Sequence, residues 1–128
     1  MNGEDISFFL QDKDKFGSVL AIDQIQHVQP GKVYVLNSNP SYKKGRHWIV
    51  LDMTSEPYFF DSFGNSPTFY NLPPCKYSKK IIQDKKSDVC GIYCIYYITM
   101  GRRALDRFGE NTKKNDKYLL QWFNKKYR

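Results

Sequence analysis

Cysteine is scarce in this sequence, and the few cysteines are not arranged for metal binding. Cys75, Cys90 and Cys94 are an odd number and lack the CxxC spacing that is typical of metal sites. We therefore expect no bound metal, and the sequence requires no cofactor. This cysteine usage favours a reducing, intracellular setting.

Long apolar runs are also missing. The longest, from Val89 to Met100, is far short of the ~20 residues that span a bilayer. The first ten residues, MNGEDISFFL, are acidic where a signal peptide is basic. We expect an intracellular, non-secreted protein with no membrane partner. Gly and Pro together make up only 14 residues, and there is neither a repeat nor a low-complexity tract.

What the sequence does contain is enough for one folded unit. With 128 residues, we expect a single domain over residues 1–128. Hydrophobic residues make up 41% and aromatic residues 16%, which disfavours intrinsic disorder because disordered chains are poor in aromatics.

Positive charge is concentrated in the second half of the chain. The net charge is +7, but residues 1–64 carry six basic and eight acidic groups, whereas residues 65–128 carry fourteen and five. Such asymmetry is compatible with one face that meets a polyanion such as DNA. A solvated lysine-rich surface is the more common reason for such an excess of positive charge.

Apolar periodicity predicts an α+β fold. We expect a short helix near residues 4–10 and a buried helix over 89–100 that ends at Gly101. A surface helix is expected over 115–127, and strands over 32–37, 47–52, 58–61 and 79–83. The expected architecture is a small antiparallel or mixed sheet packed on a central buried helix, with Cys90 at the N-terminus of that helix and further helices on the surface.

Cys90 is the first candidate for chemistry. Ser87 or Asp88 is a natural N-cap for its helix. The positive end of the helix dipole favours the nucleophilic thiolate at this position. Cys94, one turn further on, is expected to be an inert core residue. Taken alone, a cysteine at such a position is more often a small buried hydrophobic residue than a nucleophile.

His47 and Asp61 are the next candidates. If strands 47–52 and 58–61 pair about a turn at Thr54, His47 lies directly opposite Asp61 on the same face. A carboxylate there can orient an imidazole and fix its tautomer. A slip of one residue separates the pair. Taken singly, His47 can be an ordinary sheet histidine and Asp61 a turn residue.

Gln83 comes seven residues before Cys90. An amide held there can join the Cys90 backbone N–H as a donor to a developing oxyanion. Any surface glutamine looks the same in isolation, so only the ordered set His47, Asp61, Gln83 and Cys90 is informative.

These residues resemble the adenain-type cysteine proteases, the adenovirus protease and its relatives. The resemblance lies in His47-Trp48, in the segment 58–64 (YFFDSFG), in Gln83 and in the segment 88–94 (DVCGIYC). It implies that Cys90 is the nucleophile, His47 its general base, Asp61 the orienting acid and Gln83 the oxyanion donor. SUMO-type proteases share this chain order, but they usually read Asp-Cys-Gly and place the Gln six residues before the Cys. The viral branch is therefore favoured.

The resemblance further implies an endopeptidase that cleaves viral precursor proteins at Gly-containing sites during virion maturation. Trp48 would then line a narrow substrate channel. The resemblance also implies stimulation by DNA or by a viral peptide. Cys75 is the residue to examine for the peptide, and the Lys/Arg doublets at 79–80, 85–86, 102–103, 113–114 and 125–126 are those to examine for DNA. It places the protein in the host nucleus or a cytoplasmic virus factory, and in the virion. The alternatives are a deubiquitinating or deSUMOylating protease that cuts after Gly-Gly, and a non-enzymatic basic module that binds nucleic acid.

Overall fold

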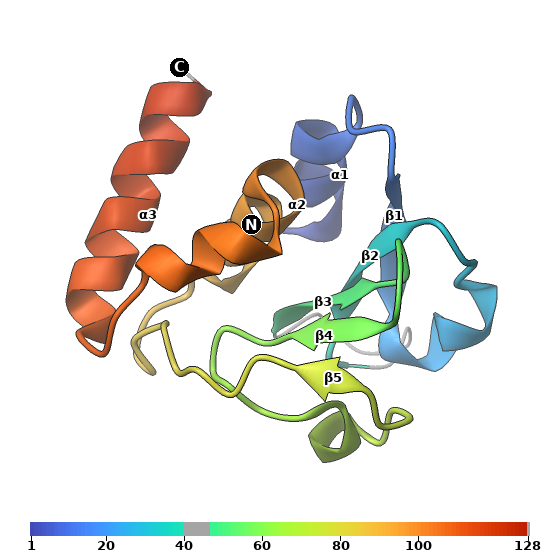
Figure 1. Cartoon of the computed structure of the whole chain (residues 1–128). Coiled ribbons are helices and arrows are strands. Elements are labelled where there is room, and N and C mark those ends of the chain that lie inside the picture. The colour runs from blue at the N-terminus through green and yellow to red at the C-terminus, as the bar shows by residue number, and fades with distance from the viewer. Residues whose placement is uncertain (40–46, 128) are drawn as a thin grey trace.

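The structure, a computed structural model, describes residues 1–39 and 47–127 and has an α+β fold (Figure 1). Within these residues, five strands form one sheet in the order β1-β2-β3-β4-β5. The strands are β1 (Phe16–Ala21), β2 (Val33–Asn37), β3 (Trp48–Asp52), β4 (Tyr58–Phe60) and β5 (Lys76–Tyr77). The helices are α1 (Gly3–Leu10), α2 (Cys90–Met100), α3 (Thr112–Lys126) and the short 3-10 helices η1 (Ile22–His27), η2 (Pro67–Tyr70) and η3 (Arg102–Arg107).

The sheet is mixed. Its centre, β2-β3-β4, is antiparallel, whereas the edge strands β1 and β5 run parallel to their neighbours. Residues alternate between the two faces, so that Val35 and Phe60 pack on the helical side and Leu36 and Phe59 on the other. Both faces are therefore covered, which explains why these strands read as nearly continuous apolar runs.

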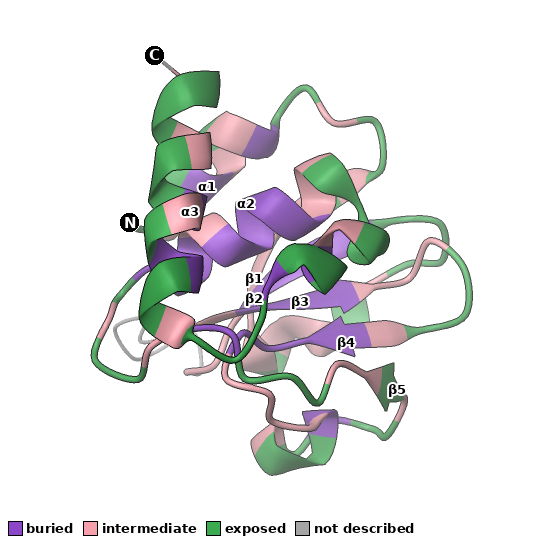
Figure 2. Ribbon diagram, turned by 60° about the vertical axis from the view of Figure 1, so that its left-hand side comes forward, coloured by how far each residue is buried: buried purple, intermediate pink, exposed green. Residues whose placement is uncertain are grey.

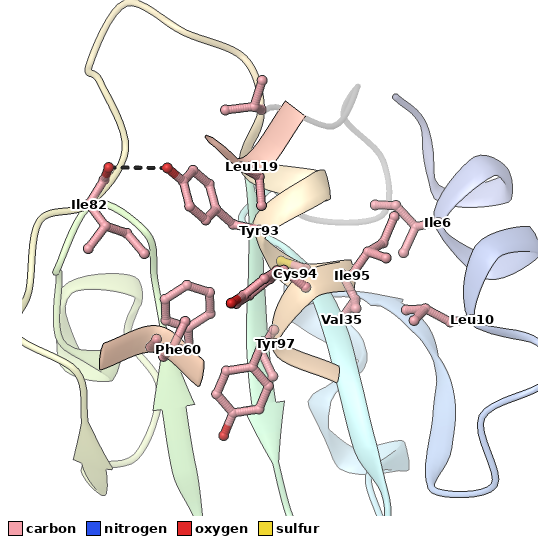
Figure 3. Close-up of a cluster of buried hydrophobic side chains, with 14 of the residues drawn as sticks. Ile6, Leu10, Val35, Phe60, Ile82, Tyr93, Cys94, Ile95, Tyr97 and Leu119 are labelled. Carbon is pink, nitrogen blue, oxygen red and sulfur yellow. Dashed lines mark hydrogen bonds between the residues drawn. The ribbon is translucent and has the colours of Figure 1, made fainter. Parts of the chain in front are cut away.

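Helix α2 is the centre of the fold. It lies between the sheet and α3, with α1 beside it (Figures 1 and 2). Its residues from Tyr93 to Tyr97 are all buried, which confirms the predicted central helix. Figure 3 shows Cys94, Ile95 and Tyr97 of this helix among side chains from α1, the sheet and α3. Gly101, with φ of 89°, ends α2 as predicted.

One predicted element is wrong, one strand was missed, and the predicted helix over 115–127 starts earlier than expected. Residues 79–83 form no strand, because the amides of Ile82 and Gln83 both donate to the single carbonyl of Ser62 (3.0 and 3.1 Å), which a strand ladder does not allow. The last strand is instead the two-residue β5, and the edge strand β1 was not predicted. Helix α3 begins at Thr112, three residues before its predicted start, where the Asn111 side chain caps it by accepting from the Lys114 amide.

None of the helices in the described residues is long and apolar enough to cross a membrane.

Candidate active site

His47 and Asp61 meet at one end of the sheet, although their predicted register is wrong. Asp52 of β3 pairs with Tyr58 of β4, so the strands are shifted by two residues from the alignment that places His47 opposite Asp61. A shift of two residues leaves both side chains on the same face, as diagonal neighbours. His47 Nε2 lies 2.7 Å from Asp61 Oδ1.

The shift comes from the turn that joins β3 to β4. Asp52 Oδ1 accepts from the Thr54 amide at 2.9 Å and from its hydroxyl at 2.5 Å. This side-chain turn, followed by Pro57 without an N–H, delays pairing until Tyr58. The connection is thus five residues long and centred on Ser55 rather than Thr54.

Asp61 is a fully buried carboxylate that is surrounded by donors. Besides His47, its Oδ1 accepts from the Phe63 amide at 2.9 Å. Its Oδ2 accepts from Asn65 Nδ2 at 3.1 Å and from the Tyr70 hydroxyl at 2.5 Å. Burial raises the pKa of Asp61, but the hydrogen bond and charge of His47, with help from Tyr70 and Phe63, outweigh this and lower it. The carboxylate is therefore held ionised.

His47 has partners on both sides of its ring. Burial opposes charging of the imidazole, but hydrogen bonds to Asp61 and to Cys90 outweigh it and raise the pKa of His47 to about 9. Because Nε2 is committed to Asp61, Nδ1 is the ring nitrogen that remains for the Cys90 thiol. The Phe63 ring stacks on His47 at a centroid distance of 4.7 Å, which fixes the plane of the imidazole.

Cys90 is the first residue of α2, as predicted, but the predicted cap is wrong. Val89 precedes the helix and gives it no side-chain cap. Ser87 is engaged elsewhere, because its hydroxyl donates to the Asp84 carbonyl at 2.9 Å. The first amides of α2, including that of Cys90, are thus left without a capping side chain from this position. Cys94 is a core residue, and burial raises the pKa of its thiol well above the usual value.

Gln83 is almost fully buried and has a fixed side chain. Its Oε1 accepts from the Ser62 hydroxyl at 2.5 Å, which orients the amide. Its Nε2 donates to Ser87, whose carbonyl and hydroxyl oxygens lie at 3.1 and 3.2 Å. For Gln83 to donate to an oxyanion as well, one of these contacts must be shared or released.

Trp48 lies between two glycines. A Cβ on Gly3 of α1 would come within 3.4 Å of the indole, and one on Gly91 of α2 within 3.3 Å. The indole N–H donates to the Met1 carbonyl at 3.2 Å. Trp48 therefore joins the start of the chain to the N-terminus of α2, directly beside Cys90.

A cleft of about 760 Å³ brings the predicted site residues together. His47, Trp48, Gln83 and Cys90 all line it, and Asp61 lies buried behind His47. The rest of its lining comes from three regions: the start of the chain (Met1, Asn2, Gly3, Asp5), the end of β2 and the turn after β4 (Asn37, Phe63), and the loop before α2 (Lys85, Ser87, Asp88).

Besides Phe63, three further residues that support the site were not predicted. Asn65 and Tyr70 hold Asp61, and Ser62 holds Gln83. Ser62 and Asn65 flank a turn that requires glycine: Gly64 has φ of 77°, and a Cβ there would come within 2.9 Å of the Lys79 carbonyl. That local pattern could have identified Ser62 and Asn65. Tyr70 lies in an irregular connection, where no periodicity marks it.

The structure also shows where Cys75 and the basic doublets lie, and among the doublets Lys85 lines the cleft. Cys75 is partly exposed and free, on the side of the sheet away from α2. The basic doublets at 79–80, 85–86, 102–103, 113–114 and 125–126 are exposed. In the described part of the chain, no cluster of three or more His, Cys, Asp or Glu could hold a metal ion.

No known family model matches this sequence, and no curated protein matches it.

Proposed function

We propose that this protein is a cysteine endopeptidase of the adenain-like type. One observation supports this most directly. The imidazole of His47 bonds a buried carboxylate, Asp61, at 2.7 Å, and it shares a cleft with the thiol of Cys90, which lies at a helix start and helps to raise the pKa of His47. A nucleophile, a base and a group that orients the base are the parts that covalent catalysis of acyl transfer needs.

The mechanism follows from the positions of these side chains. The Cys90 sulfur attacks the scissile carbonyl carbon, and His47 holds the thiol proton with Asp61 stabilising the imidazolium. The Cys90 amide and Gln83 Nε2 stabilise the oxyanion. His47 then protonates the leaving amine, which leaves an acyl-enzyme thioester. Water, deprotonated by His47, hydrolyses the thioester and restores the thiol.

The substrate part of the proposal concerns glycine. Trp48 narrows the cleft beside Cys90, which favours residues without side chains near the cut. We propose viral structural precursor proteins as substrates and virion maturation as the process. The site of action would be the host nucleus or a cytoplasmic virus factory, and the virion. Stimulation by DNA or by a viral peptide belongs to the same proposal.

Cleavage of a peptide library with Gly at varied positions tests this function. The parent protein is expected to cleave, Cys90→Ala to be inactive, and Cys75→Ser to cleave as the parent does. Turnover of fluorogenic ubiquitin or SUMO conjugates, with no cleavage of other Gly peptides, would indicate the deubiquitinating or deSUMOylating alternative instead.

A second candidate function is nucleic-acid binding, which is favoured by the exposed basic doublets. A non-enzymatic module would bind DNA with a steep salt dependence, retain this binding in Cys90→Ala, and cleave no peptide. If DNA binds and accelerates peptide cleavage by the parent, the two activities belong to one enzyme.

A further inference from the structure

The loop that carries Gln83 is held by α3 on both sides of that residue. Asn115 Nδ2 donates to the Ile82 carbonyl at 3.1 Å. The next residue, Asp116, accepts from the Asp84 amide through Oδ2 at 3.3 Å. Two consecutive residues of one helix thus bind the peptide groups immediately before and after Gln83.

Asp116 also connects this loop to helix α2, which carries Cys90. The Tyr93 hydroxyl, on α2 three residues after Cys90, donates to Asp116 Oδ1 at 2.7 Å. It also lies 3.2 Å from the Ile82 carbonyl, the contact drawn as a dashed line in Figure 3. Helix α3, the Gln83 loop and α2 therefore share one buried hydrogen-bond network.

Burying the polar side chains of Asn115 and Asp116 costs desolvation free energy, so they are not needed merely to attach α3. Asn115 and Asp116 are only 6% and 8% exposed, and among the described residues Asp116 forms no salt bridge. An apolar contact of similar size would dock α3 at least as favourably, because burying an unpaired carboxylate is expensive. What the polar contacts add is a fixed geometry for the chain between Ile82 and Asp84.

We propose that Asn115 and Asp116 are positioning residues for Gln83, an inference that rests on the proposed function. They fix the backbone on either side of Gln83, while Ser62 orients its side-chain amide toward Ser87 and the cleft. An oxyanion donor is effective only when it is held in place before the charge develops. The C-terminal helix thus contributes to catalysis without touching the substrate.

A double-mutant cycle with Asp116→Asn and Gln83→Ala tests this. The Asn amide has one acceptor oxygen where the carboxylate offers two, so either Tyr93 or Asp84 loses its partner. We expect Asp116→Asn to lower kcat about 10-fold with little change in KM, and Gln83→Ala to lower it about 100-fold. Because both act through the same donor, the double variant should be no slower than Gln83→Ala.

The matched control is Asp106→Asn, which makes the same change at an exposed position and should leave kcat unaltered. A milder variant, Tyr93→Phe, keeps Asp116 and tests the same network if Asp116→Asn folds poorly. If Asp116→Asn, or Tyr93→Phe in its place, slows cleavage as much in the Gln83→Ala background as in the parent, the role is merely structural and the inference is overturned.

Amide hydrogen exchange separates this inference from the proposed function. In Asp116→Asn, the Asp84 amide should exchange at least 10-fold faster, while the amides inside α3 stay protected. Unchanged exchange at Asp84 would overturn the positioning role even in an active protease. If the parent cleaves no peptide, the proposed function fails, and exchange alone decides whether α3 holds the Gln83 loop.

Discussion

His47 and Asp61 are diagonal neighbours across two antiparallel strands, and their Nε2 and Oδ1 atoms lie 2.7 Å apart. Because Asp61 has no exposed surface and three further donors, its carboxylate cannot turn away from the imidazole. The orientation of the His47 imidazole is therefore fixed by the fold.

Replacing Asp61 by Asn should lower kcat/KM by about 100-fold or more, because the imidazolium that forms during attack loses its stabilising charge. The measurement is cleavage of a Gly-containing peptide by Asp61→Asn, with Asp106→Asn as the control for an exposed carboxylate. Activity within threefold of the parent would exclude Asp61 from the mechanism.

The charge state of His47 gives a second prediction. Its pKa of about 9 predicts an imidazolium at neutral pH, and in Cys90→Ala this pKa should fall because the bond to the thiol is lost. NMR titration of the imidazole C–H signals measures both values, and loss of a signal in His47→Gln assigns it. An unchanged titration in Cys90→Ala would show that the two side chains are not coupled.

Stability should change with pH in a defined window. The pKa of His47 in the folded protein, about 9, is higher than its ordinary value of 6.5. The contribution of His47 to the free energy of unfolding is therefore complete below about pH 6.5 and is lost as the pH rises through about 9. This contribution is on the order of 3 kcal/mol. For Asp61 the pKa is lowered, so its contribution is present at neutral pH and is lost in acid. Urea unfolding of the parent and His47→Gln should show a difference that shrinks from pH 6.5 to pH 10.

The Tyr70 hydroxyl should stabilise the ionised carboxylate of Asp61. Tyr70→Phe removes a charge-assisted hydrogen bond, and we expect a loss of about 1–3 kcal/mol in stability together with an upward shift in the pKa of Asp61. Tyr127→Phe is the matched control, because the buried Tyr127 hydroxyl has no hydrogen-bond partner among the described residues. Equal stability losses in the two variants would contradict this role.

Trp48 should control the preference for glycine. Trp48→Ala removes the ring beside Cys90 and should allow cleavage next to bulkier residues. Trp48→Phe keeps an aromatic ring but loses the bond to the Met1 carbonyl, so it should retain the preference. Peptide-library profiles measure both. If bulky residues are cut as slowly by Trp48→Ala as by the parent, another group determines specificity.

Sequence periodicity predicted the parts of the fold that repeat along the chain. The nearly continuous apolar runs of β2 and β3 and the all-round apolar helix α2 are local patterns, and the pattern of α2 placed Cys90 at a helix start. The pairing of His47 with Asp61 could be predicted from the face of the sheet that each side chain occupies. An error of two residues in the register leaves both side chains on the same face.

Contacts between distant segments were not predictable in the same way. The turn at Asp52 is set by a side-chain bond to Thr54, and this bond moved the register. Tyr70 is brought to Asp61 by an irregular connection. Asn115 and Asp116 are polar residues near the start of a helix whose apolar stripe begins later. Periodicity marks apolar faces, so it does not show which buried polar residues a loop requires.

The most direct test of the central claim is residue-resolved alkylation by iodoacetamide at about pH 6, read by mass spectrometry. We expect Cys90 to react much faster than Cys75 and Cys94, and His47→Ala to remove this advantage. If Cys90 reacts no faster than Cys75, with or without DNA, then His47 does not activate it and the protease proposal is wrong.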